Sequence, residues 1–145
     1  MVHLESVSPD NWRNGLRVSD SQRDFVADSD AILARAYAYR DSRSEAYMIY
    51  DGDTPVGMSL HYDLDELEEY CLSQFFIDRR YQGRGLGTEA ARLVLRKMEE
   101  DGRFDRVVLC YVEGDEAARR MYERLGFAHT GERDEDEIIM ELRLR

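Results

Sequence analysis

The most informative segment of the chain reads Gln74-Phe75-Phe76-Ile77-Asp78-Arg79-Arg80-Tyr81-Gln82-Gly83-Arg84-Gly85-Leu86-Gly87-Thr88. Its apolar beginning closes a run over residues 70–77 that is typical of a buried central strand. Glycines at alternate positions then lead straight into an amphipathic helix. Because glycine leaves the backbone N–H groups accessible where a helix begins, such a turn can bind phosphate. The segment therefore points to a phosphate-bearing ligand.

Two nucleotide-binding motifs fit this turn poorly. A dinucleotide-binding fingerprint needs a glycine at its sixth position, where this chain has Thr88. A P-loop needs Lys followed by Ser or Thr, and here Thr88-Glu89 follows the last glycine. A purely structural turn between a strand and a helix is the alternative that the glycines alone leave open.

The bulk composition predicts one globular domain over residues 1–145. The chain is 43% hydrophobic and has only two prolines, so it can bury a core and is not expected to be disordered. No apolar run is long enough to span a bilayer, and residues 1–6 lack the pattern of a signal peptide. These features predict a cytoplasmic protein without a membrane partner.

The net charge is strongly negative: 20 Lys and Arg against 31 Asp and Glu give −11. This argues against nucleic acid as a partner, because phosphate backbones require clustered basic residues. It suits a cationic substrate. A second explanation remains open, since an acidic surface can also serve only to keep a protein dissolved in a salty cytoplasm.

The cysteines and histidines predict no metal site. Cys71 and Cys110 lie in apolar strand-like runs and are interpreted as reduced core thiols. His3, His61 and His129 are scattered, without the spacing of metal ligands.

The hydrophobic pattern interleaves strands and helices, which predicts a mixed α/β (α+β) fold. The predicted strands cover residues 2–7, 45–50, 54–62, 70–77, 106–112, 127–132 and 138–144, with an acidic connection at 63–69. The predicted helices cover residues 10–16, 31–40, 85–100 and 115–125.

Two segments together resemble one family. Gln82-Gly83-Arg84-Gly85-Leu86-Gly87 is similar to the Q/R-x-x-G-x-G/A loop of the GNAT superfamily of N-acetyltransferases. Residues 115–127 are similar to the family's N-x-x-A-x-x-x-Y-x-x-x-G-F segment, with Asp115 where the family usually has Asn. The resemblance implies a single N-acetyltransferase domain with a mixed, mostly antiparallel sheet flanked by helices on both faces.

The same resemblance implies acetyl-CoA as co-substrate. The loop amides would bind its pyrophosphate, and a backbone N–H near residues 76–77 would stabilise the thioester oxygen. The cofactor-binding residues that it implies are Phe76, Ile77, Gln82, Gly83, Arg84, Gly85, Leu86, Gly87, Thr88, Asp115 and Ala118.

Tyr122 is the predicted catalytic residue. It shares the inward face of its helix with Ala118 and Leu125, and the family places its general acid here, where it protonates the departing thiolate. The alternative is a core tyrosine that only packs and hydrogen-bonds. An alkylammonium has a pKa of about 10.4, so the acceptor amine must also lose a proton. The sequence does not identify the base.

The acceptor is predicted from a finer likeness and from acidic residues. Residues 75–85 are similar to the strand and loop of the spermine/spermidine (diamine) acetyltransferases, which implies a small polyamine-like acceptor that attacks the thioester directly. The resemblance to the wider family implies a homodimer. Acetylation of a protein N-terminus or lysine, and an acyl-CoA-binding module without turnover, remain alternatives. The acceptor residues predicted are Asp24, Asp63, Glu68 and Tyr70.

Overall fold

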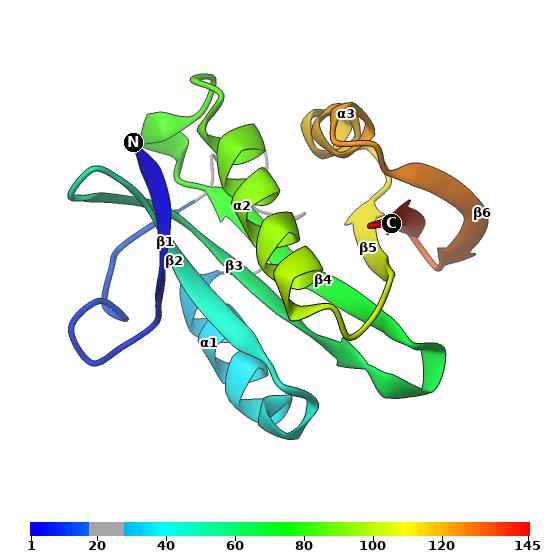
Figure 1. The fold of residues 1–145 in the computed structure, drawn as a ribbon. Helices are drawn as coiled ribbons and strands as arrows, with labels where there is room; N and C mark the ends of the chain where they lie inside the picture. Colours follow the sequence, from blue (N-terminus) through cyan, green and yellow to red (C-terminus); the bar gives the residue numbers. More distant parts are fainter. Residues whose placement is uncertain (18–27) are drawn as a thin grey trace.

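The computed structural model describes residues 1–17 and 28–145 (Figure 1). The strands of this part are β1 (Val2–Ser6), β2 (Glu45–Asp51), β3 (Thr54–Leu64), β4 (Glu69–Ile77), β5 (Arg106–Val112), β6 (Ala128–Asp134) and β7 (Glu137–Arg143). Its helices are α1 (Ser29–Ala38), α2 (Leu86–Asp101) and α3 (Glu116–Arg124), with the short 3-10 turns η2 (Arg40–Ser42), η3 (Asp65–Leu67) and η4 (Arg79–Tyr81).

The strands form one sheet in the order β1-β2-β3-β4-β5-β7-β6. Neighbouring strands are antiparallel except β4 and β5, which run parallel and pair only at Tyr70–Leu72 with Val107–Leu109. Beyond Leu72 both strands continue without pairing to each other, so the sheet opens between them. The predicted mixed, mostly antiparallel fold is confirmed.

A β-bulge in β4 lies where this opening begins. His61 of β3 pairs with Leu72, but Leu60 pairs with Gln74, so Ser73 is an extra residue on β4. The bulge shifts the alternation of side chains along the strand. Leu72 and Phe75 therefore both pack into clusters with α2, although they are three residues apart.

Helices cover both faces of the sheet, and Figure 1 shows α2 in front of it and α1 behind it. Ile32 of α1 packs with Met48, Met58 and Leu60 on one face. On the other face, Val94 and Met98 of α2 belong to a separate apolar cluster, which also contains Tyr70 and Leu72 of β4. The helix residues in these clusters are the apolar ones that recur with helical periodicity in the sequence, because each helix buries one apolar face.

The predicted helix over residues 10–16 is wrong. The backbone N–H groups of Asn11 and Trp12 donate to the Ser8 carbonyl, and the chain then runs on without helical structure. Gly15 has a φ of 65°, which is not a helical conformation. Asn14 also bonds locally, since its Oδ1 accepts from the Leu16 N–H. Local side-chain bonds of this kind compete with helix formation.

Two boundaries also differ from those predicted. β3 extends to Leu64, so the acidic connection is shorter than 63–69, with η3 in its middle. The last two strands pair as far as Asp134 and Glu137, which leaves residues 135–136 as a two-residue turn in place of 133–137.

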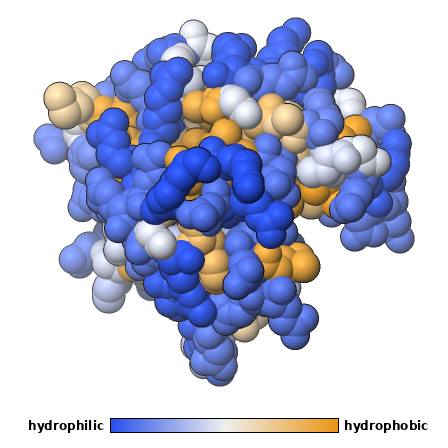
Figure 2. Space-filling view, turned by 45° about the vertical axis from the view of Figure 1, so that its right-hand side comes forward, coloured by the Kyte–Doolittle hydropathy of each residue, from blue (hydrophilic) through white to orange (hydrophobic). Residues whose placement is uncertain are grey.

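The surface is mainly hydrophilic: Figure 2 shows hydrophobic side chains mostly in hollows between charged and polar ones. Within residues 1–17 and 28–145, no helix is long and apolar enough to cross a membrane. The same residues contain no group of three or more His, Cys, Asp or Glu side chains arranged to hold a metal ion.

Candidate active site

A cavity of about 400 Å³ lies between the end of β4, the start of α2 and one side of α3. The structure brings most of the predicted cofactor-binding residues together around it. Those that line it are Phe76, Ile77, Gln82, Gly83, Gly85, Leu86, Gly87, Thr88, Asp115 and Ala118, together with Tyr122.

The start of α2 and the glycine turn before it line one side of this cavity. The N-cap residue, Gly85, has a φ of 78°, and no side chain caps the helix. Gly83 has a φ of 79°, so the turn needs glycine at both positions. The N–H groups of Leu86, Gly87 and Thr88 have no acceptor inside the helix, because they belong to its first turn. These N–H groups and the helix dipole fit a diphosphate.

Gln82 and Asp78 hold the loop onto the end of β4. The Gln82 Nε2 donates to the Ile77 carbonyl at 2.8 Å. Asp78 is 1% exposed, and its carboxylate accepts from the backbone N–H groups of Arg17 and Arg80. Burial by itself would raise the Asp78 pKa, but the hydrogen bonds from the Arg80 side chain and from the two backbone N–H groups outweigh it and lower that pKa.

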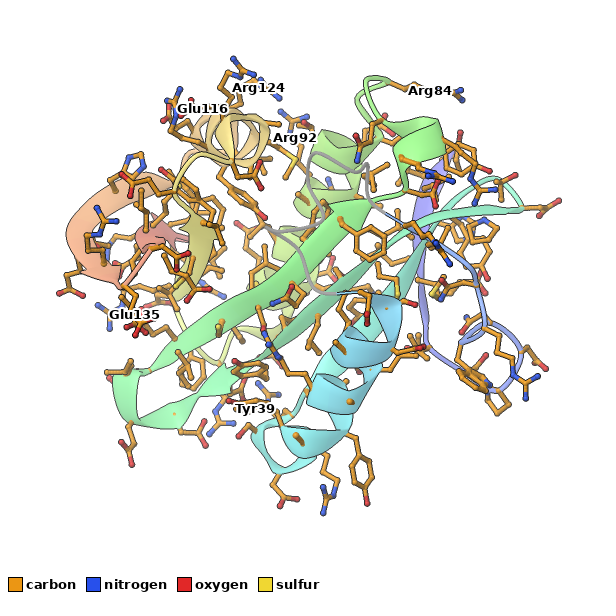
Figure 3. All side chains as sticks on the ribbon, turned by 180° about the vertical axis from the view of Figure 1, so that it is seen from behind. Tyr39, Arg84, Arg92, Glu116, Arg124 and Glu135 are labelled. Atoms are coloured by element: carbon orange, nitrogen blue, oxygen red, sulfur yellow. The ribbon has the colours of Figure 1, made fainter. Side chains whose placement is uncertain are left out.

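The basic residues at this cavity differ from the one predicted. Arg84 does not line it: its guanidinium lies over the Tyr81 ring, and Figure 3 shows the side chain pointing away from the molecule. Arg120 and Arg124 of α3 line it instead. Sequence reasoning missed this pair. Their i, i+4 spacing beside the Tyr122 face was the signal that could have indicated them.

Tyr122 lies between α3 and the sheet and is 7% exposed. Its ring packs edge-on against Phe127. Burial, and secondarily the charge of Asp115, raises the pKa of its phenol. Among the described residues its hydroxyl forms no hydrogen bond, and the residue lines the cavity. A protonated phenol in this position can donate to a leaving group.

Asp115 caps α3 and is also 7% exposed. One carboxylate oxygen, Oδ1, accepts from the Ala118 N–H at 3.3 Å. Burial raises its pKa above the usual range of an aspartate.

A second cavity of about 190 Å³ opens beside the first and reaches Arg35 of α1. It shares Phe75, Asp115, Ala118 and Tyr122 with the first cavity, so the two meet at these residues. Its walls include Ser73 and Gln74 of β4 and Cys110 and Val112 of β5, in the parts of these two strands that do not pair with each other. A group donor bound in the first cavity and a group acceptor bound in the second would meet in the gap between β4 and β5.

The predicted acceptor residues do not lie in this second cavity. Asp24 falls outside the described residues. Asp63 and Tyr70 line a separate cavity of about 290 Å³ against α2. Glu68 is exposed between η3 and β4, with a φ of 54°. None of Asp63, Glu68 and Tyr70 lines a cavity with Tyr122, although Tyr70 and Tyr122 belong to the same apolar cluster.

Asp63 and Tyr70 belong to a network of charges. The Asp63 carboxylate accepts from Arg43 at 2.6 Å and from Arg103 at 2.9 Å. Arg43 also bonds both oxygens of Asp101, and the Tyr70 hydroxyl donates to Asp101 at 2.6 Å. The donors of this network already occupy the Asp63 carboxylate, which was expected to hold an amine.

The second cavity is lined by Tyr62 and by residues that were not predicted to bind the acceptor, among them Arg35, Cys71, Cys110 and Glu137. In β3, Tyr62 precedes Asp63, and in β4, Cys71 follows Tyr70. Because side chains alternate along a strand, the two members of each pair lie on opposite faces of the sheet, next to different cavities. Both thiols are free, as predicted, but Cys110 is exposed and is not a core residue.

The sequence profile of the acetyltransferase (GNAT) family matches residues 7–127. The chain belongs to this family. It is therefore an acetyltransferase, and the predicted family, fold and co-substrate, acetyl-CoA, are confirmed. The spermine/spermidine N(1)-acetyltransferase of Bacillus subtilis (strain 168) is 29% identical over 141 residues, which are 92% of this chain and 91% of the relative.

Solved structures agree on the fold of this GNAT acetyltransferase. The spermidine N-acetyltransferase from Vibrio cholerae, in complex with CoA and spermine, has a TM-score of 0.77 at 15% identity and covers 99% of this chain and 95% of its own. An acetyltransferase from Thermus thermophilus has a TM-score of 0.77 at 20% identity, with 99% and 97% covered.

Proposed function

We propose that this acetyltransferase transfers the acetyl group of acetyl-CoA to a primary amine of a small, polyamine-like or diamine-like acceptor. One observation carries the proposal: two cavities reach the gap between β4 and β5 and share Asp115 and Tyr122. The first cavity has the features of a diphosphate site, and the second is left for the acceptor.

The geometry suits direct attack of the amine on the thioester. Loop amides at the start of α2 bind the diphosphate and orient the donor. The Tyr122 hydroxyl protonates the departing sulfur, because its phenol is protonated at neutral pH. A preorganised backbone donor near residues 76–77 would stabilise the oxygen on which negative charge develops, and one such donor is worth about 3 kcal/mol.

Three observations support a polyamine-like acceptor over other amines. The Bacillus subtilis relative, similar over nearly the full chain, is named for spermine and spermidine. The net charge of −11 attracts polycations to the protein as a whole. Glu137 is the exposed carboxylate in the second cavity and can interact with an ammonium group.

A panel of acceptors tests this proposal. Release of free thiol from acetyl-CoA would be followed with spermidine, spermine, putrescine, amino acids, aminoglycosides and peptides with free N-termini or lysines. We expect the highest kcat/KM with a polyamine. A peptide as the best substrate would replace the proposed acceptor with a protein. Turnover of no amine, despite binding of acetyl-CoA, would overturn N-acetylation itself.

Residues 1–145 are proposed to act as one domain, in the cytoplasm and as a homodimer, without nucleic acid or membrane as a partner. The support is the acidic composition and, for the homodimer, what the resemblance to the family implies. Sedimentation equilibrium on the purified protein checks the oligomeric state: a single species near 17.0 kDa would contradict the dimer.

A further inference from the structure

The proposed function leaves one proton without an acceptor. An alkylammonium with a pKa of about 10.4 is almost fully protonated at neutral pH, and only the neutral amine can attack. Some group in the acceptor cavity must therefore take this proton, directly or through a water molecule. The inference below rests on the proposed function, because it assigns that group.

Most titratable groups of the two cavities are already protonated at neutral pH. Burial raises the pKa of the Cys71 thiol to about 11, and it also raises the pKa values of Cys110 and of the phenols of Tyr62, Tyr111 and Tyr122. No histidine lies among the described residues that line either cavity. Only carboxylates remain as bases there.

Two carboxylates line the cavities, and their positions differ. Glu137 is exposed at the start of β7 and lines the second cavity alone. Asp115 is nine-tenths buried and lines both cavities, next to Tyr122. Its Oδ1 caps α3, and no hydrogen bond to Oδ2 is found among the described residues. Asp115 therefore lies where the two cavities meet, and this is where the amine of the acceptor must reach the thioester of the donor.

We propose that Asp115 is the general base that removes a proton from the acceptor ammonium. Burial favours this transfer for both partners, because a carboxylate and an ammonium each lose hydration in the cavity while the neutral acid and amine lose little. Burial raises the pKa of Asp115, and a carboxylate with a raised pKa is a stronger base. The family usually has Asn at this position, so this chain has a titratable group where an amide would have none.

The proton balance of the reaction is complete with these two residues. Asp115 takes one proton from the ammonium, and the neutral nitrogen forms a bond to the carbonyl carbon of the thioester. The carbon–sulfur bond then breaks, and the sulfur takes the Tyr122 hydroxyl proton. The second proton lost by the nitrogen returns to the Tyr122 oxygen, and Asp115 releases its proton to solvent.

Other charges around Asp115 influence its titration. Glu116 of its own helix raises its pKa. Arg120 and Arg124, further along the same helix, line the first cavity, and from the neighbouring elements Arg35 of α1 and Glu137 of β7 line the second.

The decisive variant is Asp115→Asn, because Asn also caps helices and has nearly the same shape. With spermidine, or the best amine of the panel, we expect kcat/KM at neutral pH to fall about 10²-fold. In the variant, kcat/KM should rise about tenfold per pH unit towards the amine pKa near 10.4, whereas the intact enzyme should be flat above the Asp115 pKa. A fluorinated analogue of the acceptor, with a less basic amine, should recover most of the lost rate.

Glu116→Gln is the matched control: it also removes a carboxylate at the start of α3, and Figure 3 shows Glu116 on the outer side of that helix. We expect kcat/KM at neutral pH and the shape of the pH profile to stay those of the intact enzyme, with only the acid limb moved to lower pH, because Glu116 raises the Asp115 pKa. Calorimetry should give the same affinity for acetyl-CoA in all three proteins. If the intact enzyme is active but the Asp115→Asn variant keeps the original pH profile, Asp115 is not the base. The same follows if the variant loses as much kcat/KM with the fluorinated analogue as with the natural amine. Either result leaves the proposed function standing. An intact enzyme that acetylates no amine overturns the proposed function, and the base with it.

Discussion

Gly87, in the first turn of α2, lies directly against Met121 of α3: a Cβ atom on Gly87 would stand 3.2 Å from the Met121 sulfur and 3.4 Å from Cγ1 of Ile77. The contact with Met121 would be tighter than ordinary van der Waals packing, and the contact with Ile77 would lie at its lower limit. The missing side chain therefore lets the start of α2 approach α3 and the end of β4, the three elements that enclose the first cavity.

Replacing Gly87 with Val should widen this contact and move the first-turn N–H groups. We expect the Kd for acetyl-CoA to rise at least about tenfold, because the diphosphate loses well-placed donors. Isothermal titration calorimetry measures the change. Glu89→Val, exposed in the same turn, is the control. An unchanged Kd for Gly87→Val would show that this close approach does not shape the anion site.

Tyr122→Phe should lower kcat about 10²-fold and leave the Kd for acetyl-CoA unchanged, because the ring still packs on Phe127 while the proton donor is lost. Stability should change little, since the hydroxyl bonds to no described residue. Steady-state kinetics and calorimetry check both statements. Tyr37→Phe, 68% exposed, is the control. A kcat equal to that of the intact enzyme would remove Tyr122 from the mechanism.

Asp63→Asn separates a structural role from an acceptor role. Asp63 is buried between the guanidinium groups of Arg43 and Arg103, so loss of its charge should cost about 2–3 kcal/mol of unfolding free energy. We expect KM for the acceptor to stay the same, since Asp63 lines a cavity remote from Tyr122. Urea unfolding and steady-state kinetics measure the two effects. A higher KM with unchanged stability would restore Asp63 as an acceptor residue.

The buried Asp78 should make stability depend on pH. Its folded-state pKa is lowered, so its stabilisation is fully present above its unfolded pKa of about 3.9 and is lost as the pH falls through the folded value. Asp78→Asn should therefore destabilise the protein at pH 7, by about 1–3 kcal/mol, and less at acid pH. Denaturant unfolding at both pH values measures this difference. A constant difference would mean that the Asp78 charge contributes nothing.

Local sequence patterns predicted most elements, because periodicity and glycine placement act within a few residues. The glycine turn, the helix after it and the inward position of Tyr122 all follow from such patterns. The helix expected at residues 10–16 failed for a local reason as well: the bonds of Asn14 and the positive φ of Gly15 were not visible in the hydrophobic pattern.

The acceptor site could not be predicted from one chain read in order. Whether Tyr62 or Asp63 points into the second cavity depends on the register in which β3 pairs with its neighbours. A shift of that register by one residue would exchange the side chains on the two faces of the sheet. Likewise, α3 places Arg120 and Arg124 at the first cavity only because it packs beside the start of α2.

Read alone, the amino acids specify the phosphate-binding turn, the tyrosine on its helix and the family to which they point, since each is encoded within a short segment. Folding in three dimensions adds the bulge at Ser73, the separation of β4 from β5 and the junction where Asp115 meets Tyr122. These features depend on hydrogen bonds between strands far apart in the chain, and such pairings leave no trace in local periodicity.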